Sequence, residues 1–472
     1  MVVGRTIPVA LAYLALSACT TVGPDYHLPA DAIVNAPSAQ EPFISVTQAT
    51  ASEPPPDQWW KLFDDPVLTA LIEQALRANT NLRIAEANLL RSDSLLAEAL
   101  TSRSAAKANL ETNWAKPSAE EAMQQVRPQT HQIYNGGLSA SYDLDLFGEI
   151  RRGIEAAGAD DEAAVAARDL VRITVAAQTA QAYADACNAG HEIAIHRQLI
   201  AILNEDLHLT RLAIAHGRAP QFEQERQHGL VVTAMARLPS MEAAQKNAVF
   251  RIAALIGRTP AEYDRSLLDC SKSLALRQLL PVGDGRTLLR RRPDVRAAER
   301  RLAAATARIG VSTAALYPSI KLGASVGSTG AVADLLGPLT NRFGIGPLIS
   351  WDLQRSSVRA RIAQAEAQTK ANLAAFDGSV LTALREVEIA LNSYAADLER
   401  LEDFKSARDN AVEVAKRTAT LRRGGRVGGG AALDAQRARI LAEQAVSAAQ
   451  TDINRDQIAV FLALGGGWGA AN

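Results

Sequence analysis

Apolar residues recur at helical spacing along most of the chain, and the pattern occurs twice at an offset of about 210 residues. Residues 150–216 form one uninterrupted helical pattern, about 100 Å long at 1.5 Å per residue. Residues 356–423 repeat it with apolar residues at every seventh position, which predicts a coiled-coil seam. Each long helix is expected to end in a glycine-containing turn and to return in a shorter helix, residues 222–257 and 431–464. Such units must stack to bury their apolar stripes.

Matching residues mark the duplication on both sides of these turns. Tyr183 matches Tyr394, and Asn-Leu-Arg at 81–83 matches Asp-Val-Arg at 294–296. Shorter helices over 66–104 and 293–316 are expected to cover the half of each long helix that its return helix leaves exposed. At the turns, the matched sets are Arg211, Gly217, Phe222, Glu223 and Arg226 in the first copy and Arg422, Gly428, Leu433, Asp434 and Arg437 in the second.

Four stretches have strand character: residues 108–114, 133–144, 320–328 and 343–353. Aromatic residues gather in or beside them, as in the girdles of membrane strands, although a small soluble sheet capping the helices would fit the same pattern. Four strands cannot enclose a useful bore, because even an eight-stranded barrel is filled by its own side chains. A pore therefore requires several subunits, and three copies would supply twelve strands. The aromatic residues are Trp114, Tyr134, Tyr142, Phe147, Phe343 and Trp351.

Composition supports long packed helices, since aromatic residues make up 5% of the chain and charged residues 21%. Net charge is −1 with acidic and basic residues interleaved, which excludes a nucleic-acid partner. No later apolar stretch approaches the roughly 20 residues of a membrane-spanning helix, so strands must cross lipid if anything does.

The N-terminus resembles a bacterial lipoprotein signal. Arg5 precedes a short apolar run, and Leu-Ser-Ala leads into Cys19. This predicts that residues 1–18 are removed and that Cys19 is acylated, the alternative being a plain signal peptide with an incidental cysteine. The residue after the cysteine is Thr20, and because an aspartate there would favour retention in the inner membrane, we expect delivery to the outer membrane. Residues 19–64 then form a lipid-anchored tether, rich in Pro, Ser, Ala and Thr from residue 30 onward.

The remaining cysteines, Cys187 and Cys270, would meet an oxidising compartment and could pair. Cys187 continues the heptad series of Ile173 and Ala180, as a small core residue would, so we expect two free thiols.

Sequence motifs of enzymes are absent or lack the required spacing or residues. His191 and His196 are five residues apart, whereas a zinc-protease helix needs four, so we interpret them as solvated surface residues. The glycine-rich stretch at 424–430 lacks the Lys-Ser/Thr of a phosphate loop. We expect no enzymatic activity, no metal and no cofactor beyond the lipid on Cys19.

An ordered series of motifs resembles the outer-membrane factors of tripartite efflux pumps, the TolC superfamily, and within them the OprM/NodT-type lipoproteins. The motifs are Cys19 with Gly-Pro-Asp-Tyr at 23–26, Trp59-Trp60, Tyr-Asp-Leu-Asp-Leu-Phe-Gly at 142–148, Arg-Arg-Pro-Asp-Val-Arg-Ala-Ala-Glu at 291–299, Leu-Asp-Ala-Gln-Arg at 433–437 and Ala-Leu-Gly-Gly-Gly-Trp at 463–468.

This resemblance implies a mainly α fold with a small β part, in which long coiled-coil hairpins arise by internal duplication. Four strands per chain would join a trimeric twelve-stranded barrel in the outer membrane of a Gram-negative bacterium, above a twelve-helix periplasmic tunnel. The first repeat would span residues 65–257 and the second residues 293–472, with an equatorial connecting segment over 258–292.

The resemblance also implies a function. The homotrimer would be a passive duct for small toxic compounds or drugs, fed by an inner-membrane RND pump through a periplasmic adaptor, the membrane fusion protein. Two alternatives stay open at this point: the outer component of a protein-secretion system, and a lipid-anchored coiled-coil structural protein without a pore.

In this family the carboxylate of the Leu-Asp-Ala-Gln-Arg motif, here Asp434, lines the periplasmic constriction. Converging carboxylates repel one another, so cationic partners must hold the aperture closed. The alternative is a solvated carboxylate at a helix N-terminus. The second turn is richer in glycine than is usual in the family, and Gly430 stands where a bulkier residue is common, so we predict a less tightly sealed aperture. The expected aperture residues are Asp434, Arg437, Arg422, Glu223 and Arg226.

Overall fold

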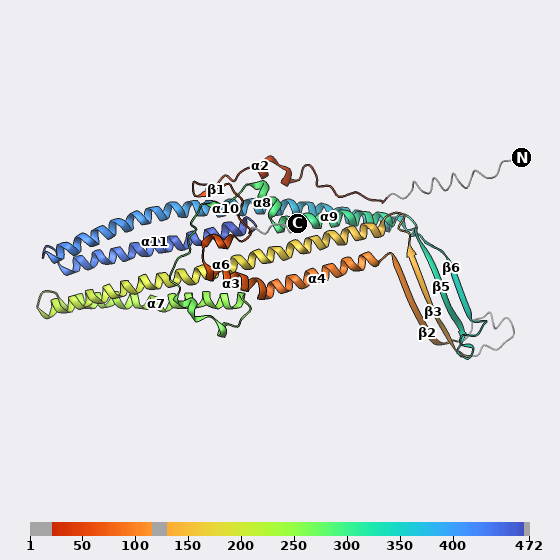
Figure 1. Ribbon diagram of the computed structural model, residues 1–472, viewed down its shortest axis with the longest axis horizontal. Coiled ribbons are helices and arrows are strands. Elements are labelled where there is room, and N and C mark those ends of the chain that lie inside the picture. The colour runs from red at the N-terminus through yellow and green to blue at the C-terminus, as the bar shows by residue number, and fades with distance from the viewer. Residues whose placement is uncertain (1–20, 116–129, 467–472) are drawn as a thin grey trace. The chain divides into compact units, whose positions relative to one another are not determined.

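The computed structural model describes residues 21–115 and 130–466 and contains two compact units (Figure 1). The strand unit comprises residues 21–29, 89–164 and 298–376 within that range. The hairpin unit comprises residues 30–88, 165–297 and 377–466. Cys19 and the end of the last motif lie outside the described residues. Over the described chain, no helix combines the length and hydropathy required to cross a membrane.

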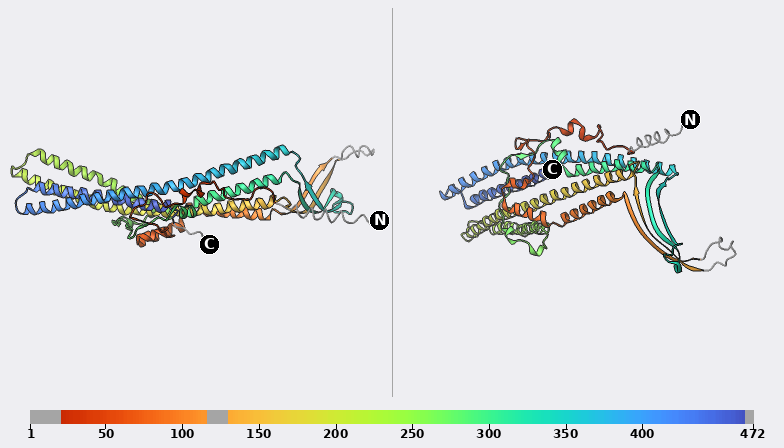
Figure 2. Two further views of the ribbon diagram at one scale, coloured as in Figure 1. Left: turned by 90° about the horizontal axis from the view of Figure 1, so that it is seen from above. Right: turned by 45° about the vertical axis from the view of Figure 1, so that its right-hand side comes forward.

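The element order confirms the duplication. The first copy contains α3 (Pro66–Ala78), α4 (Thr80–Thr101), β2 (Ser104–Ala115), β3 (His131–Asp143), α6 (Glu149–Ala215) and α7 (Gln221–Leu255). The second copy contains α8 (Gly285–Arg291), α9 (Pro293–Ala314), β5 (Ser319–Ala331), β6 (Asn341–Ser350), α10 (Arg355–Arg423) and α11 (Gly429–Ala463). The long helices have 67 and 69 residues and both return helices have 35, close to the bounds predicted from periodicity. Each return helix runs back along its own long helix (Figure 2).

Asn79 interrupts the first short helix, which was expected to be continuous. Its side-chain oxygen accepts the amides of Asn81 and Leu82, at 2.9 and 3.3 Å, and so starts α4. Its amide nitrogen donates to the Leu255 carbonyl at the end of α7, at 3.0 Å. In the second copy, Arg292 lies between α8 and α9, and its guanidinium donates to the Ala463 carbonyl at the end of α11, at 2.8 Å. In each copy, a side chain at the helix break therefore satisfies the end of the return helix.

The two turns correspond in a register that differs from the sequence match. Gly217 and Gly425 both adopt the left-handed conformation, with φ of 67° and 69°, in the same position after α6 and α10. Their offset is 425 − 217 = 208, whereas the matched residues suggested 211. Asp434 is therefore the counterpart of Arg226, and the predicted pairing of the turns is wrong by three residues. Three residues are nearly one helical turn, so the matched side chains still share a helix face.

Apolar side chains of three helices form a core in the hairpin unit. Leu199, Leu203 and Leu207 of α6 pack with Val231 of α7 and Ile440 of α11. The spacing of four along α6 places these leucines on one face. The turn-proximal part of α6 is thus packed against return helices of both copies.

Residues 30–63, part of the predicted tether over 19–64, belong to the hairpin unit and pack against its helices. Trp59 is fully buried and stacks on Phe461 with 4.7 Å between ring centroids. The amides of Ile44 and Ser45 donate to the Glu388 carboxylate at 2.8 and 3.1 Å. Strand β1 (Thr50–Ala51) pairs with β4 (Leu280–Pro281) of the connecting segment. A composition without periodicity indicated irregular backbone but could not reveal these attachments.

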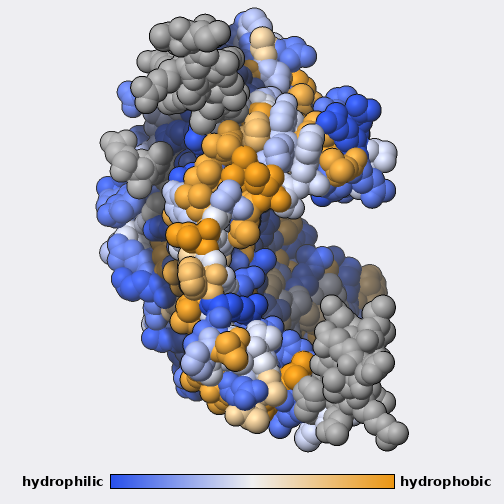
Figure 3. All heavy atoms as spheres, turned by 90° about the vertical axis from the view of Figure 1, so that its right-hand side faces the viewer, coloured by the Kyte–Doolittle hydropathy of each residue, from blue (hydrophilic) through white to orange (hydrophobic). Residues whose placement is uncertain are grey.

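In the strand unit, the strands form an antiparallel sheet in the order β2-β3-β5-β6. The register places apolar and polar side chains on opposite faces, because paired residues share a face and neighbours along a strand alternate. The apolar face carries Leu110, Trp114, Leu138, Tyr142, Leu322, Val326, Phe343, Ile345 and Ile349. The polar face carries Lys107, Asn109, Glu111, Asn135, Ser139, Lys321, Ser325, Thr329 and Arg342, with Ile133 and Leu348 as its large apolar exceptions. Figure 3 views the molecule from the side on which the strands lie and shows a band of apolar side chains there.

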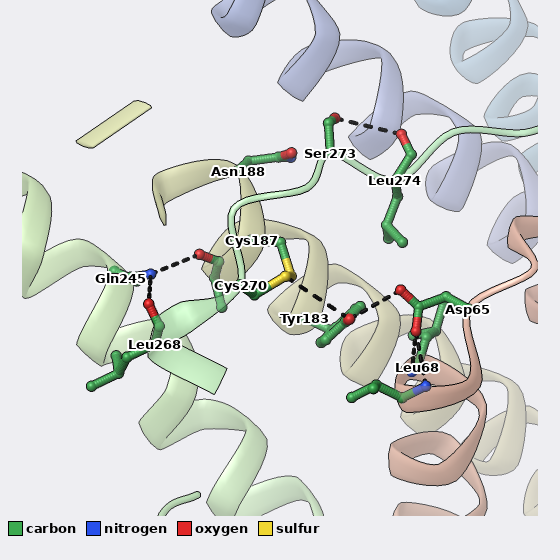
Figure 4. The surroundings of a disulfide bond; sticks show 12 residues. Asp65, Leu68, Tyr183, Cys187, Asn188, Gln245, Leu268, Cys270, Ser273 and Leu274 are labelled. Atoms are coloured by element: carbon green, nitrogen blue, oxygen red, sulfur yellow. Dashed lines mark hydrogen bonds between the residues drawn. A yellow bond between two sulfur atoms is a disulfide. The ribbon is translucent and has the colours of Figure 1, made fainter. Parts of the chain in front are cut away.

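A disulfide joins Cys187 of α6 to Cys270 of the connecting segment, so the expectation of two free thiols is wrong (Figure 4). Cys187 is fully buried, as its heptad position predicted. The connecting segment packs directly on α6 here: a Cβ added to Gly190 would lie 2.1 Å from the Cys270 carbonyl oxygen. Gln245 of α7 also donates to the Leu268 carbonyl at 3.0 Å. A sequence separation of 83 gave no indication of this proximity.

The interpretation of His196 as a solvated residue is also wrong. Its ring is buried, with Nε2 2.8 Å from the Ala234 carbonyl of α7 and Nδ1 3.2 Å from the amide of Gln444 in α11. Both ring nitrogens therefore contact neighbouring helices, as a core histidine requires. Within residues 21–115 and 130–466, no group of His, Cys, Asp or Glu is arranged to hold a metal ion.

Candidate functional site at the helical tips

A cavity of about 720 Å³ lies between the turn-proximal ends of the two helical hairpins, within the hairpin unit. Both copies line it, through α6 and α7 on one side and through α10 and α11 on the other. The hairpins approach closely beside it, because a Cβ added to Gly429 would lie 3.4 Å from Leu209. Its charged or titratable lining residues are Asp206, His216, Arg218, Glu223, Arg226, Arg422 and Asp434.

The structure brings the predicted aperture residues together. Glu223, Arg226, Arg422 and Asp434 line the cavity, and Arg437 joins them through an ion pair with Asp434 at 2.8 Å. Glu223 forms an ion pair of the same i,i+3 spacing with Arg226, and this contact lowers the pKa of the Glu223 carboxyl. Both pairs join residues three apart on a return helix. Each carboxylate is therefore held by an arginine of its own helix.

The position of Asp434 argues against a simple helix-terminus role. Glu223 lies in the first turn of α7, where the helix dipole favours a carboxylate. Asp434 is five residues beyond Gly429, the first residue of α11, and the dipole interaction falls off within the first turn. Its side chain is 63% exposed beside the cavity. Asp434 is thus presented to solvent, with Arg437 as its ion-pair partner.

Asp206 of α6 is a member of the charge cluster that the sequence analysis missed. The residue is only 7% exposed. Burial raises the pKa of its carboxyl, and the charge of Asp434 adds to the rise, while Arg437 and Arg226 oppose it. Asp206 therefore interacts with charges on both α7 and α11. The available signal was its place seven residues after Leu199, on a buried stripe where a carboxylate is unexpected.

The cluster balances three carboxylates, those of Asp206, Glu223 and Asp434, against the guanidinium groups of Arg226, Arg422 and Arg437. A buried or half-buried carboxylate that loses its cationic neighbours is left repelling the other carboxylates. Asp206 of the first hairpin interacts with the charges of Asp434 and Arg437 on the second, so the balance of charge affects how the two tips meet. It contains no nucleophile activated by an adjacent base, as covalent catalysis would need.

An amphipathic sheet in a chain with long helical hairpins and a charge cluster at their tips is typical of a subunit of a membrane channel. The chain belongs to the outer membrane efflux protein family, which it matches over residues 71–258 and 285–466. These two matched segments fall on the two repeats. The protein is accordingly located in the outer membrane of a Gram-negative bacterium, with a periplasmic helical portion.

Similarity to individual relatives supports the assignment to this family. Nodulation protein T of Rhizobium leguminosarum bv. trifolii is 29% identical over 367 residues, or 77% of each chain. The pyoverdine export outer membrane protein OpmQ of Pseudomonas putida is 27% identical over 466 residues, covering 97% of this chain and 96% of that one. The structure of the outer-membrane channel OprN superimposes with a TM-score of 0.85 at 32% identity, covering 95% of this chain and all of that one. The predicted resemblance is confirmed.

Proposed function

We propose that three copies of this chain assemble into a passive duct that exports small toxic compounds across the outer membrane as part of a tripartite efflux system. The main support for this proposal is the amphipathic sheet. Its apolar face suits lipid and its polar face suits a water-filled lumen, but four strands cannot close around a lumen. Three sheets together supply twelve strands.

Strand length supports a membrane position for the sheet. β2 has 12 residues and β3 has 13, which corresponds to about 40 Å along each strand. At the usual tilt of roughly 40°, such strands rise about 30 Å, enough for the apolar band and its flanking aromatic girdles.

The proposed partners are an inner-membrane RND pump and a periplasmic adaptor, and the proposed anchor is lipid on Cys19. Two Pseudomonas putida relatives are named for transport of small molecules, the pyoverdine export outer membrane protein OpmQ and the toluene efflux pump outer membrane protein TtgF. We propose the same kind of cargo here, small molecules delivered by a pump. A protein-secretion component would differ in its partners, and a pore-less structural protein would give no conductance.

Paired arginine substitutions on the two faces of the sheet test the duct. Val326→Arg places a cation on the apolar face, at a cost of about 2–4 kcal/mol near the membrane midplane in every subunit, and should abolish channel insertion into planar bilayers. Ser325→Arg, the next residue on the polar face, should still insert and change the ion selectivity. Equal insertion of both variants, or a wild-type protein that stays monomeric in detergent and gives no conductance steps, would overturn the proposal.

We further propose that the charge cluster closes the periplasmic end of the duct, with Asp434 lining the lumen. Cationic partners on the return helices would balance the carboxylates that three subunits bring together. The aperture would open when an adaptor changes that balance.

Gly430→Leu is expected to reduce leakage through the resting channel several-fold. Gly430 lines the cavity, and a Cβ there would meet no atom within 4 Å. A leucine would fill the opening and stabilise the start of α11 by about 1 kcal/mol through its higher helix propensity. Single-channel recording in planar bilayers measures the leakage, with Gly378→Leu, at another open helical position, as the control. An unchanged leakage would contradict the role of Gly430.

Acidification is expected to close the channel further through Asp206. Its pKa lies above the ordinary value of 3.8, so the closed tip binds the proton more tightly than an open tip in which the group is solvated. The resulting stabilisation of the closed state is present below the ordinary pKa and is lost as the pH rises through the raised one. Conductance should therefore fall several-fold between neutral pH and about pH 4.

Asp206→Asn should flatten this pH dependence, because an amide does not titrate. The exposed Glu399→Gln, on α10, should leave the dependence intact. The groups that face Asp206 are Arg226 and Glu223 of α7 and Asp434 and Arg437 of α11. A pH profile of Asp206→Asn identical to that of the wild type would assign the effect to one of these other groups.

A further inference from the structure

The connection between β5 and β6 exposes large apolar side chains at the far end of the sheet. Residues 332–340, which we call the leucine flap, include the exposed residues Leu335 and Leu336 and the fully exposed Leu339. Surface loops that face only water are usually polar. An apolar cluster of this kind indicates a surface that meets another apolar phase.

The flap is held in a defined conformation. The Leu336 amide donates to the Tyr134 hydroxyl of β3 at 3.0 Å, and that hydroxyl lies 2.6 Å from the Ser328 hydroxyl and 3.1 Å from that of Thr340. Tyr134 is only 3% exposed. Leu336 adopts a φ of 61°, which leucine rarely does, so the surrounding contacts must impose this conformation.

The register shows toward which face of the sheet the flap folds. Tyr134 pairs with Gly330 and shares its face with Leu138 and Tyr142, that is, with the apolar face. The Thr340 side chain also packs on this face, since a Cβ added to Gly330 would lie 2.6 Å from Thr340 Cγ2. The flap is therefore continuous with the apolar face.

Polar contacts occupy the opposite face at the same end of the sheet. The Thr329 hydroxyl and the Arg342 guanidinium both donate to the Asn135 side-chain oxygen, at 3.0 and 2.6 Å. These residues belong to the polar face, which the proposed duct turns toward water. A leucine cluster covering the lumen would have to lie over this network instead.

We infer that the leucine flap inserts its side chains among the lipid acyl chains of the outer leaflet that surrounds the channel. The flap extends the lipid-facing surface beyond the ends of the strands and fixes the depth of the sheet in the membrane. The partner is the lipid surface itself, and burial of exposed leucines supplies the free energy of attachment. This inference rests on the proposed membrane position of the sheet.

A fluorescent label at Leu339 tests the inference. In the disulfide-bonded, acylated protein, Leu339→Cys adds one reactive thiol, which is labelled with the polarity-sensitive fluorophore NBD in channels reconstituted into phospholipid vesicles. We expect blue-shifted emission and loss of most of its intensity when the vesicles contain nitroxide-labelled lipid. Thr329→Cys, on the polar face at the same end, should show water-like emission and quenching by aqueous iodide instead.

Leu110→Cys, on the apolar face within β2, separates failure of the inference from failure of the proposed function. If lipid quenches the label at 110 but not at 339, the sheet lies in the membrane and the flap does not. If lipid quenches neither label, the proposed membrane position of the sheet fails as well. A label at 339 shielded from both iodide and lipid would place the flap against a neighbouring subunit and would overturn the inference.

Tyr134→Phe supplies a second test in the Leu339→Cys background. It removes the hydroxyl that accepts the Leu336 amide and should shift the NBD emission to the red and weaken quenching by lipid. Tyr142→Phe makes the same change on the same face away from the flap and should leave both signals unchanged. Equal effects of the two substitutions would contradict the assigned role of Tyr134.

Discussion

Replacing Arg226 and Arg437 together with alanine is expected to open the channel at rest and to raise its conductance in planar bilayers manyfold. The two arginines pair with Glu223 and Asp434 and also face the buried Asp206. Without them, three carboxylates per subunit repel one another across the hairpin tips. The expected result is loss of the closed state.

The size of this effect follows from symmetry. The substitutions remove two guanidinium groups from each of three subunits, six in all, and both groups oppose the charge of Asp206. Equivalent changes in the three subunits act on the same aperture, so their effects on closure combine. The closed population should therefore fall from dominant to minor.

Arg417→Ala is the matched control. Arg417 forms an exposed ion pair with Glu413 on α10, at 2.8 Å, and does not line the tip cavity. Its removal should leave the resting conductance unchanged, and the lysine double variant Arg226→Lys with Arg437→Lys should stay mostly closed. A resting conductance as low in the double alanine variant as in the wild type would show that charge pairing does not close the tips.

Removing the disulfide with Cys187→Ala and Cys270→Ala is expected to lower the free energy of unfolding by about 4 kcal/mol. The bond closes a loop with a sequence separation of 83 and attaches the connecting segment to α6. Without it, the unfolded chain gains conformational entropy, and the segment around Cys270 is held by hydrogen bonds such as those of Gln245 with Leu268 and of Asn454 with Ser273. The melting temperature in detergent should fall, and the connecting segment should become sensitive to protease.

A reductant provides the control for this prediction. Reduced wild-type protein should behave like the double variant, whereas the double variant should not respond to reductant. Equal melting temperatures for oxidised and reduced wild-type protein would show that the disulfide does not stabilise the fold.

Long elements can be predicted accurately from this sequence, whereas their termini and the partners of their side chains cannot. The predicted long helix over 150–216 is α6, Glu149–Ala215, because a sustained heptad pattern has no competing interpretation. The helix break at Asn79 was missed, since its cause is a capping contact with Leu255, far away in the sequence. The turn register was wrong by three residues because a shift of nearly one helical turn preserves the amphipathic pattern.

The candidate site was predicted in part. Four of the five predicted aperture residues line one cavity and the fifth, Arg437, pairs with Asp434, but Asp206 completes the cluster from a helix face that seemed apolar. His196 and the cysteines were misjudged for the same reason: their chemistry depends on neighbours contributed by α7, α11 and the connecting segment.

Periodicity within the chain is a local property, and it established the duplicated hairpins and the alternating strands, from which we predicted that a pore needs several copies. Contacts between distant segments depend on how helices and loops pack in space. They alone revealed the Cys187–Cys270 bond, the burial of Asp206 between two return helices and the fold of the leucine flap onto the apolar face. Helical and strand spacing specify which face a side chain occupies, but packing determines what it meets there.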